Sequence, residues 1–99
     1  MSTETGQTIE TIKERALPIL QQNRVRKAGL FGSVVRGEMT AGSDIDFLVE
    51  IDPSLSLLDL VTLKLELEGV LDRHVDVVEY ETLKPALRER VLFEQVPIL

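Results

Sequence analysis

The segment DIDFLVEI, residues 44–51, alternates polar and apolar side chains with the period of two that a β-strand imposes. Its apolar face would comprise Ile45, Phe47, Val49 and Ile51. Its other face would carry Asp44, Asp46, Leu48 and Glu50. A strand with one apolar and one mainly acidic face can be covered on one side only, so the sheet that contains it should carry its helices on one face.

Apolar spacing along the rest of the chain predicts four helices and three further strands. The expected helices are 8–23, 33–36, 56–71 and 81 or 82 to about 93, and the expected strands are 26–31, 44–51, 74–79 and 95–99. Pro18 should kink or split the first helix, whereas Pro85 is tolerable in the first turn of the last one. Ser56 and Asp59 match a capping box. The predicted fold class is α/β, a small mixed sheet of about four strands.

The composition favours one globular domain over residues 1–99, with residues 1–7 as a flexible tail. Hydrophobic residues make up 43% of the chain, which argues against a disordered protein. The absence of cysteine excludes disulfides, zinc–thiolate sites and cysteine nucleophiles. No signal sequence and no apolar run long enough to span a bilayer is present, so we expect a cytoplasmic location.

The net charge of −6 is unevenly distributed. Residues 43–83 hold two Lys or Arg against eleven Asp or Glu, a local charge of −9. Nucleic-acid backbones are bound by clustered Lys and Arg, so direct nucleic-acid binding is not expected. Such a segment suits a protein partner with a basic face, although a solvated acidic surface that keeps the chain soluble explains much of the charge.

Asp44 and Asp46 are candidate metal ligands. Two carboxylates on the same face of a strand repel each other unless a cation lies between them, and hard oxygen ligands suit Mg2+ or Mn2+. In the third expected strand, Val75 and Val77 alternate with Asp76. If the two valines pack on the helices, Asp76 lies on the same open face as Asp44 and Asp46, and three carboxylates converge.

Gly32 and Ser33 are candidate phosphate-binding residues because they follow an apolar strand and begin a short helix that Gly37 ends. A helix start exposes unpaired backbone N–H groups and the positive end of the helix dipole. Gly32 lets the backbone approach a ligand closely, and Ser33 adds a hydroxyl donor. Arg36 falls on the same side of this turn and would contact phosphate oxygens or form a salt bridge to a nearby aspartate. Together with the candidate metal ligands, these three residues would suit a metal-bound triphosphate.

The chain contains a Gly-Ser pair, ten intervening residues, Asp-x-Asp and a later strand aspartate. This combination resembles the signature of the DNA polymerase β-like nucleotidyltransferases. The matching residues are Gly32-Ser33, Asp44-Ile45-Asp46 and Asp76. More narrowly, FGSVVRGEMTAGSDIDFLVEID resembles the minimal nucleotidyltransferases (MNT), which have a palm-like core. This chain has Val35 where that family usually has alanine, and the specific part of the resemblance spans Phe31 to Asp76.

The resemblance implies an ATP-dependent antitoxin that transfers AMP to a hydroxyl, in the family a tyrosine, of a HEPN-domain ribonuclease toxin. Carried over to this chain, Gly32 and Ser33 would hold the triphosphate, with Arg36 as a weaker match. Asp44 and Asp46 would bind two Mg2+ ions, for which Mn2+ can substitute. Asp76 would complete the site as a metal ligand or as the base. Because the chain is short, the acceptor is expected on another protein.

Two alternatives to protein adenylylation remain at the level of sequence. In the first alternative, the chain is a non-catalytic antitoxin that neutralises its partner by binding, and its nucleotide site is vestigial. This alternative is motivated by the acidic, leucine-rich segment, whose apolar residues cover more than one helix face. Nucleotide transfer to a small molecule or to RNA is disfavoured by the small size and the acidic charge. The leucine-rich residues are Leu57, Leu58, Leu60, Val61, Leu63, Leu65 and Leu67.

Overall fold

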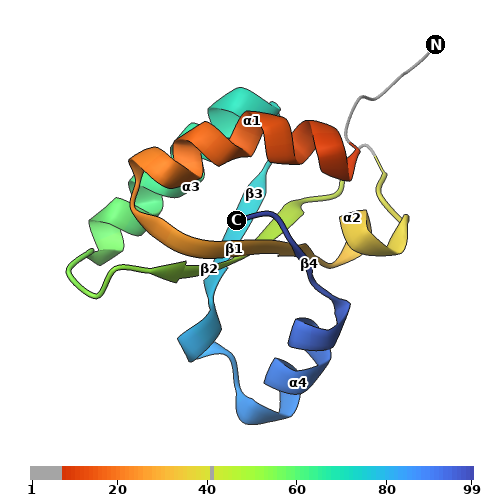
Figure 1. Ribbon diagram of the computed structural model, residues 1–99. Helices are drawn as coiled ribbons and strands as arrows, with labels where there is room; N and C mark the ends of the chain where they lie inside the picture. Colours follow the sequence, from red (N-terminus) through yellow and green to blue (C-terminus); the bar gives the residue numbers. More distant parts are fainter. Residues whose placement is uncertain (1–7, 41) are drawn as a thin grey trace.

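The computed structural model describes residues 8–40 and 42–99, so the tail predicted over residues 1–7 lies outside the described residues. Within these residues, four helices, four strands and one turn of 3-10 helix follow one another. Figure 1 shows their arrangement. The helices are α1 Ile9–Gln22, α2 Ser33–Arg36, α3 Leu57–Leu71 and α4 Pro85–Glu94. The strands are β1 Val25–Phe31, β2 Ile45–Ile51, β3 Val75–Glu79 and β4 Val96–Pro97.

The strands form one mixed sheet in the order β3-β2-β1-β4. β1 is antiparallel to both β2 and β4, whereas β2 and β3 are parallel. The connection between the two parallel strands runs through α3, as a parallel pair requires. The short β4 contains Pro97 and lies at the edge of the sheet, where a residue without a backbone N–H is tolerated. The predicted fold class is confirmed.

Helices α1 and α3 cover one face of the sheet and enclose the core (Figure 1). The predicted alternation of β2 is confirmed, because its apolar side chains at positions 45, 47 and 49 are fully buried. Each such side chain contributes roughly 1.5–3 kcal/mol of hydrophobic stabilisation. The core between this face and the two helices includes Ile12, Ala16, Leu20, Ile45, Phe47, Val49, Leu63, Leu67, Leu71 and Val75.

Both long helices begin at side-chain caps. Thr8 accepts a hydrogen bond from the backbone N–H of Thr11 at the start of α1. The capping box predicted for α3 is present, because the Asp59 carboxylate accepts from the Ser56 backbone N–H at 2.7 Å and the Ser56 hydroxyl accepts from the Asp59 N–H. Pro18 does not split α1, since it lies on the exposed side of the helix, where water can satisfy the carbonyl that it leaves unpaired.

The opposite face of the sheet differs from the prediction at two points. Leu48 is fully buried, although it shares this face with the acidic residues. Helix α4 lies on this side of the sheet, so the prediction that helices pack on one face holds for α1 and α3 only (Figure 1). The last helix also starts later than expected, because Pro85 holds Lys84 in an extended conformation after the 3-10 turn Tyr80–Thr82.

Among the residues that the structure describes, no helix has the length and apolar character needed to cross a membrane.

Candidate active site

The three candidate acidic residues gather at one end of the sheet. Asp46 of β2 and Asp76 of β3 are direct partners in the parallel register, and neighbouring strands lie about 4.8 Å apart. Val75 is 2% exposed on the helix-covered face, so the exposed Asp76 projects from the opposite face. Asp44 directly precedes β2, and its negative charge acts on Asp46. All three carboxylates therefore belong to one acidic cluster, Asp44, Asp46 and Asp76.

Gly32 brings the start of α2 into contact with this cluster. It lies between β1 and α2 with φ of 80° and ψ of −149°, a backbone conformation that is nearly confined to glycine. The carboxylate oxygen Oδ2 of Asp46 occupies the place that a Cβ atom on residue 32 would take. The pairing of Phe31 with Asp46 across β1 and β2 accounts for this close approach. The predicted phosphate-binding turn and the predicted metal ligands are therefore adjacent.

The carboxyl group of Asp46 has a raised pKa. Burial raises the pKa of its carboxyl group, and the negative charges of Asp76 and Asp44 raise it further, while the positive charge of Arg36 lowers it. Each of the first three causes disfavours the ionised carboxylate. A cation beside Asp46 would reverse this effect, because it stabilises negative charge on all three side chains.

The chemistry of this cluster fits a divalent cation, although the side chains do not enclose one. In residues 8–40 and 42–99, no three His, Asp or Glu side chains converge closely enough to hold a metal ion. Like charges repel, so a cation beside the acidic cluster would stabilise its three carboxylates. Carboxylate oxygens are the ligands that Mg2+ and Mn2+ prefer. Here they come from neighbouring strands, and a bound cation would offset the repulsion that Asp46 experiences from Asp44 and Asp76.

The raised pKa of Asp46 leads to a prediction about stability. A carboxyl group whose pKa is higher in the folded protein binds its proton more tightly there, so its ionisation removes stability as the pH rises above the ordinary value of 3.8. We expect Asp46→Asn to melt at a higher temperature than the wild type at pH 7 in metal-free buffer. This difference should shrink as the pH falls below 4. Thermal melts at several pH values test this expectation.

Glu89→Gln, which removes an exposed carboxylate on α4, is the matched control and should leave the melting temperature unchanged. Mg2+ should raise the melting temperature of the wild type more than that of Asp46→Asn, because a ligand that binds the folded state stabilises it. A wild type that is more stable than Asp46→Asn at pH 7 in metal-free buffer would contradict the proposed electrostatic strain.

Ser33 and Arg36 occupy the two ends of α2. Ser33 is the first residue of the helix and is partly buried, and its hydroxyl makes no hydrogen bond within the described part of the chain. Arg36 pairs with Glu38 at 2.9 Å and with Glu94 of α4 at 3.5 Å. Its salt bridges therefore go to glutamates and not to an aspartate, while its charge still acts on Asp46.

Arg73 is a site residue that the sequence did not reveal. It lies in the turn between α3 and β3, and its guanidinium donates hydrogen bonds of 2.8 Å to the backbone carbonyls of both Thr40 and Ser43. Ser43 immediately precedes Asp44, so Arg73 fixes the chain where the acidic pair begins. Neither spacing nor residue type marks such a contact, because its acceptors are backbone atoms 30 and 33 residues away.

Replacing Arg73 should weaken cation binding without unfolding the protein. Arg73→Gln removes the charged donor to both carbonyls and leaves Asp44 less firmly positioned. Because groups that orient metal ligands typically change affinity by 10–100-fold, we expect about a tenfold weaker affinity for Mn2+, measured by electron paramagnetic resonance. Arg73→Lys should restore part of the affinity.

Arg88 supplies the matched control, because its guanidinium also donates to two backbone carbonyls, those of Glu81 and Leu83. Arg88→Gln should leave the Mn2+ affinity unchanged. Equal losses in the two variants would show that the effect is not specific to the segment before Asp44.

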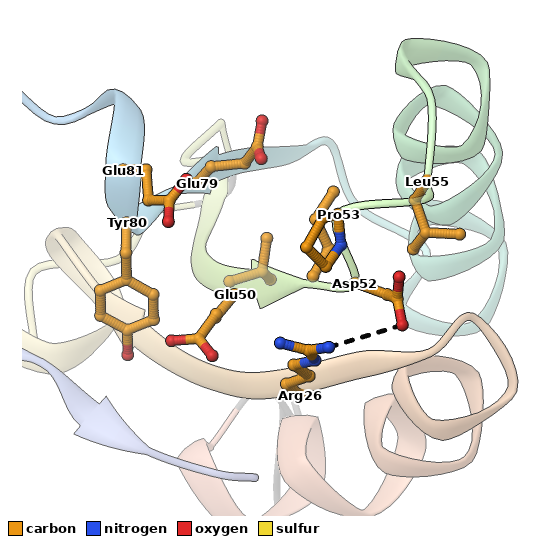
Figure 2. Close-up of a pocket in the computed structure, with 10 residues that line it drawn as sticks. Arg26, Glu50, Asp52, Pro53, Leu55, Glu79, Tyr80 and Glu81 are labelled. Carbon is orange, nitrogen blue, oxygen red and sulfur yellow. Dashed lines mark ion pairs between the residues drawn. The ribbon is translucent and has the colours of Figure 1, made fainter.

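A separate hollow of about 320 Å3 lies at the other end of β2 (Figure 2). Figure 2 shows the ring of Tyr80 beside Glu50 and the ion pair between Arg26 and Asp52, whose charged atoms are 3.6 Å apart. The acidic cluster is not among the described residues that line this hollow. Glu50 lies four residues along the strand from Asp46, about 13 Å away. The hollow is therefore distinct from the candidate active site.

The chain is similar to known proteins both in sequence and in structure. A model of the family described as "Nucleotidyltransferase domain" matches residues 13–98. A relative from Methanocaldococcus jannaschii, named "Putative protein adenylyltransferase", is 48% identical over 91 residues, which cover 92% of this chain and 98% of the relative.

Two solved structures have the same fold. One, described as a "putative minimal nucleotidyltransferase", superimposes with a TM-score of 0.83 at 39% identity and covers 98% of this chain and 99% of its own. The other, described as a "toxin-antitoxin with AMP-PNP", superimposes with a TM-score of 0.77 at 25% identity and covers 88% of this chain and 72% of its own. The chain therefore belongs to the nucleotidyltransferase domain family.

Proposed function

We propose that this chain is an antitoxin that transfers AMP from ATP to a tyrosine hydroxyl of a HEPN ribonuclease toxin. The observation that carries the proposal is the contact of Asp46 with Gly32, which joins the acidic cluster to the start of α2. A relative that is 48% identical is named as a protein adenylyltransferase. A structural neighbour is a toxin–antitoxin complex with AMP-PNP, an ATP analogue.

Each candidate residue has a role that its position supports. The backbone at Gly32 and the hydroxyl of Ser33 bind the triphosphate, because both lie at the N-terminus of α2 beside Asp46. To contact phosphate oxygens, Arg36 breaks one of its two salt bridges, which it forms with Glu38 and Glu94. Asp44 and Asp46 would hold the divalent cations, and Asp76 would either ligate a cation or accept the proton of the acceptor hydroxyl.

The reaction is an in-line displacement at the α-phosphorus of ATP. The acceptor hydroxyl loses its proton and its oxygen forms a bond to the α-phosphorus, while the bond to pyrophosphate breaks. Two divalent cations, when bound, supply the charge neutralisation that such transfers need. The chain itself contributes positioning: α2 orients the triphosphate, and the carboxylates of β2 and β3 fix the site where attack takes place.

The direct test is a transfer assay with the purified chain and the product of the neighbouring gene, which the proposal expects to be a HEPN toxin. We expect radiolabel from the α-phosphate of ATP to appear on the toxin when Mg2+ is present, and EDTA should abolish it. Mass spectrometry of the labelled toxin should find AMP on a tyrosine. ATP labelled at the γ-phosphate should leave no label, because pyrophosphate departs. A toxin that stays unlabelled with Mg2+ or Mn2+ present would refute the proposed function.

A further inference from the structure

Helix α3 has two apolar faces, of which only one is buried. Leu63, Leu67 and Leu71 pack into the core between α3, α1 and the sheet. The other face is exposed and apolar, and we call it the leucine face. It consists of Leu57, Leu58, Val61 and Leu65, which are 77%, 76%, 45% and 60% exposed. Contiguous exposed apolar surface of this kind marks an interaction site.

The leucine face continues into an acidic end. Leu58, Val61 and Leu65 are followed at the same spacing by two acidic residues on the next turns, Glu68 and Asp72. Successive steps of three and four residues keep the first four of these positions in one stripe along α3, the spacing by which helices pack side by side. Asp72 is the C-cap residue directly after the helix. The stripe therefore changes from apolar to negative toward the C-terminus of α3. A hollow of about 300 Å3 beside its acidic end is lined by Glu68, Asp72, Arg73 and His74.

The charge of the stripe argues against a second copy of this chain as the occupant. Antiparallel packing of two α3 helices would bury the exposed Asp72 against the leucines of the partner, which is costly for a carboxylate without a basic partner there. Parallel packing would place like charges side by side, and the net charge of −6 adds repulsion between copies. A helix with apolar residues at matching positions and Lys or Arg at one end satisfies both parts of the stripe.

The acidic end of the stripe also lies close to the candidate active site. Asp72 is four residues before Asp76, so their Cα atoms are at most about 14 Å apart. Resting on the proposed function, we propose that the leucine face docks one helix of the acceptor protein. The apolar residues of this helix pack on Leu58, Val61 and Leu65, and its basic end pairs with the exposed Asp72. The carboxylate of Glu68 adds negative charge beside it but already accepts a hydrogen bond from the Val75 N–H. This arrangement brings the acceptor protein to the acidic cluster.

The test compares affinities for the HEPN toxin of the transfer assay, measured by isothermal titration calorimetry. Leu58→Ser with Leu65→Ser should weaken binding by about 100-fold or more, because apolar residues at the centre of an interface dominate affinity. Asp72→Lys should weaken it by about tenfold, and added salt should reduce the difference from wild type. The leucine-face variant changes exposed positions, so its melting temperature should match that of the wild type. Asp72→Lys should melt slightly lower, because residue 72 has φ of 54°, a conformation that Asp tolerates better than Lys.

Leu87→Ser with Phe93→Ser on α4 is the matched control, because these side chains are 50% and 91% exposed. It should bind the toxin as the wild type does. If the wild type transfers AMP and the leucine-face double variant binds the toxin normally, the docking proposal is wrong and the proposed function stands. An equal loss in the α4 control would also overturn it. If the wild type neither binds nor labels the toxin, both proposals fail.

Discussion

Asp44→Asn combined with Asp46→Asn should abolish AMP transfer while leaving the protein folded. The double substitution removes two of the three carboxylates of the acidic cluster, and amides are poor ligands for divalent cations. Cation-assisted charge neutralisation contributes several kcal/mol to the transition state, and each 1.36 kcal/mol is a factor of ten in rate. We therefore expect the labelling of the toxin to fall by about a thousandfold or more.

The control for this variant removes the same number of charges elsewhere. Glu81 and Glu89 are both exposed and lie outside the acidic cluster, so Glu81→Gln with Glu89→Gln should retain full transfer. Calorimetry should show that the Asp44/Asp46 variant still binds the toxin. Loss of toxin neutralisation in cells with binding intact supports catalysis. Neutralisation that persists without labelling would instead support an antitoxin that acts by binding alone.

Much of the fold could be predicted because local and tertiary preferences agree. The alternation in residues 44–51 required one buried face, and β2 has it, with Ile45 and Phe47 fully buried. The capping box at Ser56 fixed the start of α3 to the residue. The prediction was less accurate at two prolines. At Pro18 the outcome depended on which side of α1 faces water. Before Pro85 it depended on the restriction that proline imposes on the conformation of the preceding residue.

The candidate site was predictable to the extent that it depends on strand periodicity. The period of two places Asp46 and Asp76 on the face opposite Val75, and the register of β2 and β3 makes them direct partners. What periodicity cannot give is how separate segments meet. The salt bridge of Arg36 to Glu94 and the hydrogen bonds of Arg73 to backbone carbonyls join parts of the chain that are 30 or more residues apart.

Leu48 illustrates a further limit. Its position in β2 assigns it to the acidic face, and that face would be open if α1 and α3 were the only layers. The structure buries Leu48 completely, on the side of the sheet where α4 lies (Figure 1). None of the residues of α4, Pro85–Glu94, is itself buried, so the apolar spacing that predicted this helix did not show on which side of the sheet it lies.

Gly32→Ala should impair both stability and transfer, for two physical reasons that can be separated. The backbone of Gly32 has φ of 80° and ψ of −149°, and holding a residue with a Cβ there costs about 1–3 kcal/mol. For a domain of this size, each kcal/mol lowers the melting temperature by about 4–8 °C. The added Cβ would also stand where Oδ2 of Asp46 lies, so the carboxylate must move away from its place in the acidic cluster. We expect transfer to fall by about 100-fold or more, because small displacements at a reacting centre have effects of this size.

Gly37→Ala separates the two effects. Gly37 also has a positive φ, 71°, but no described atom lies within 4 Å of the place that its Cβ would take. This variant should therefore lose stability through backbone strain and keep its transfer rate below its melting temperature. Measuring the melting temperature and the transfer rate of both variants at 20 °C distinguishes strain from displacement of Asp46. If Gly37→Ala lost as much transfer as Gly32→Ala, or if Gly32→Ala kept the wild-type rate, the contact between Gly32 and Asp46 could not be what joins the predicted phosphate-binding turn to the acidic cluster.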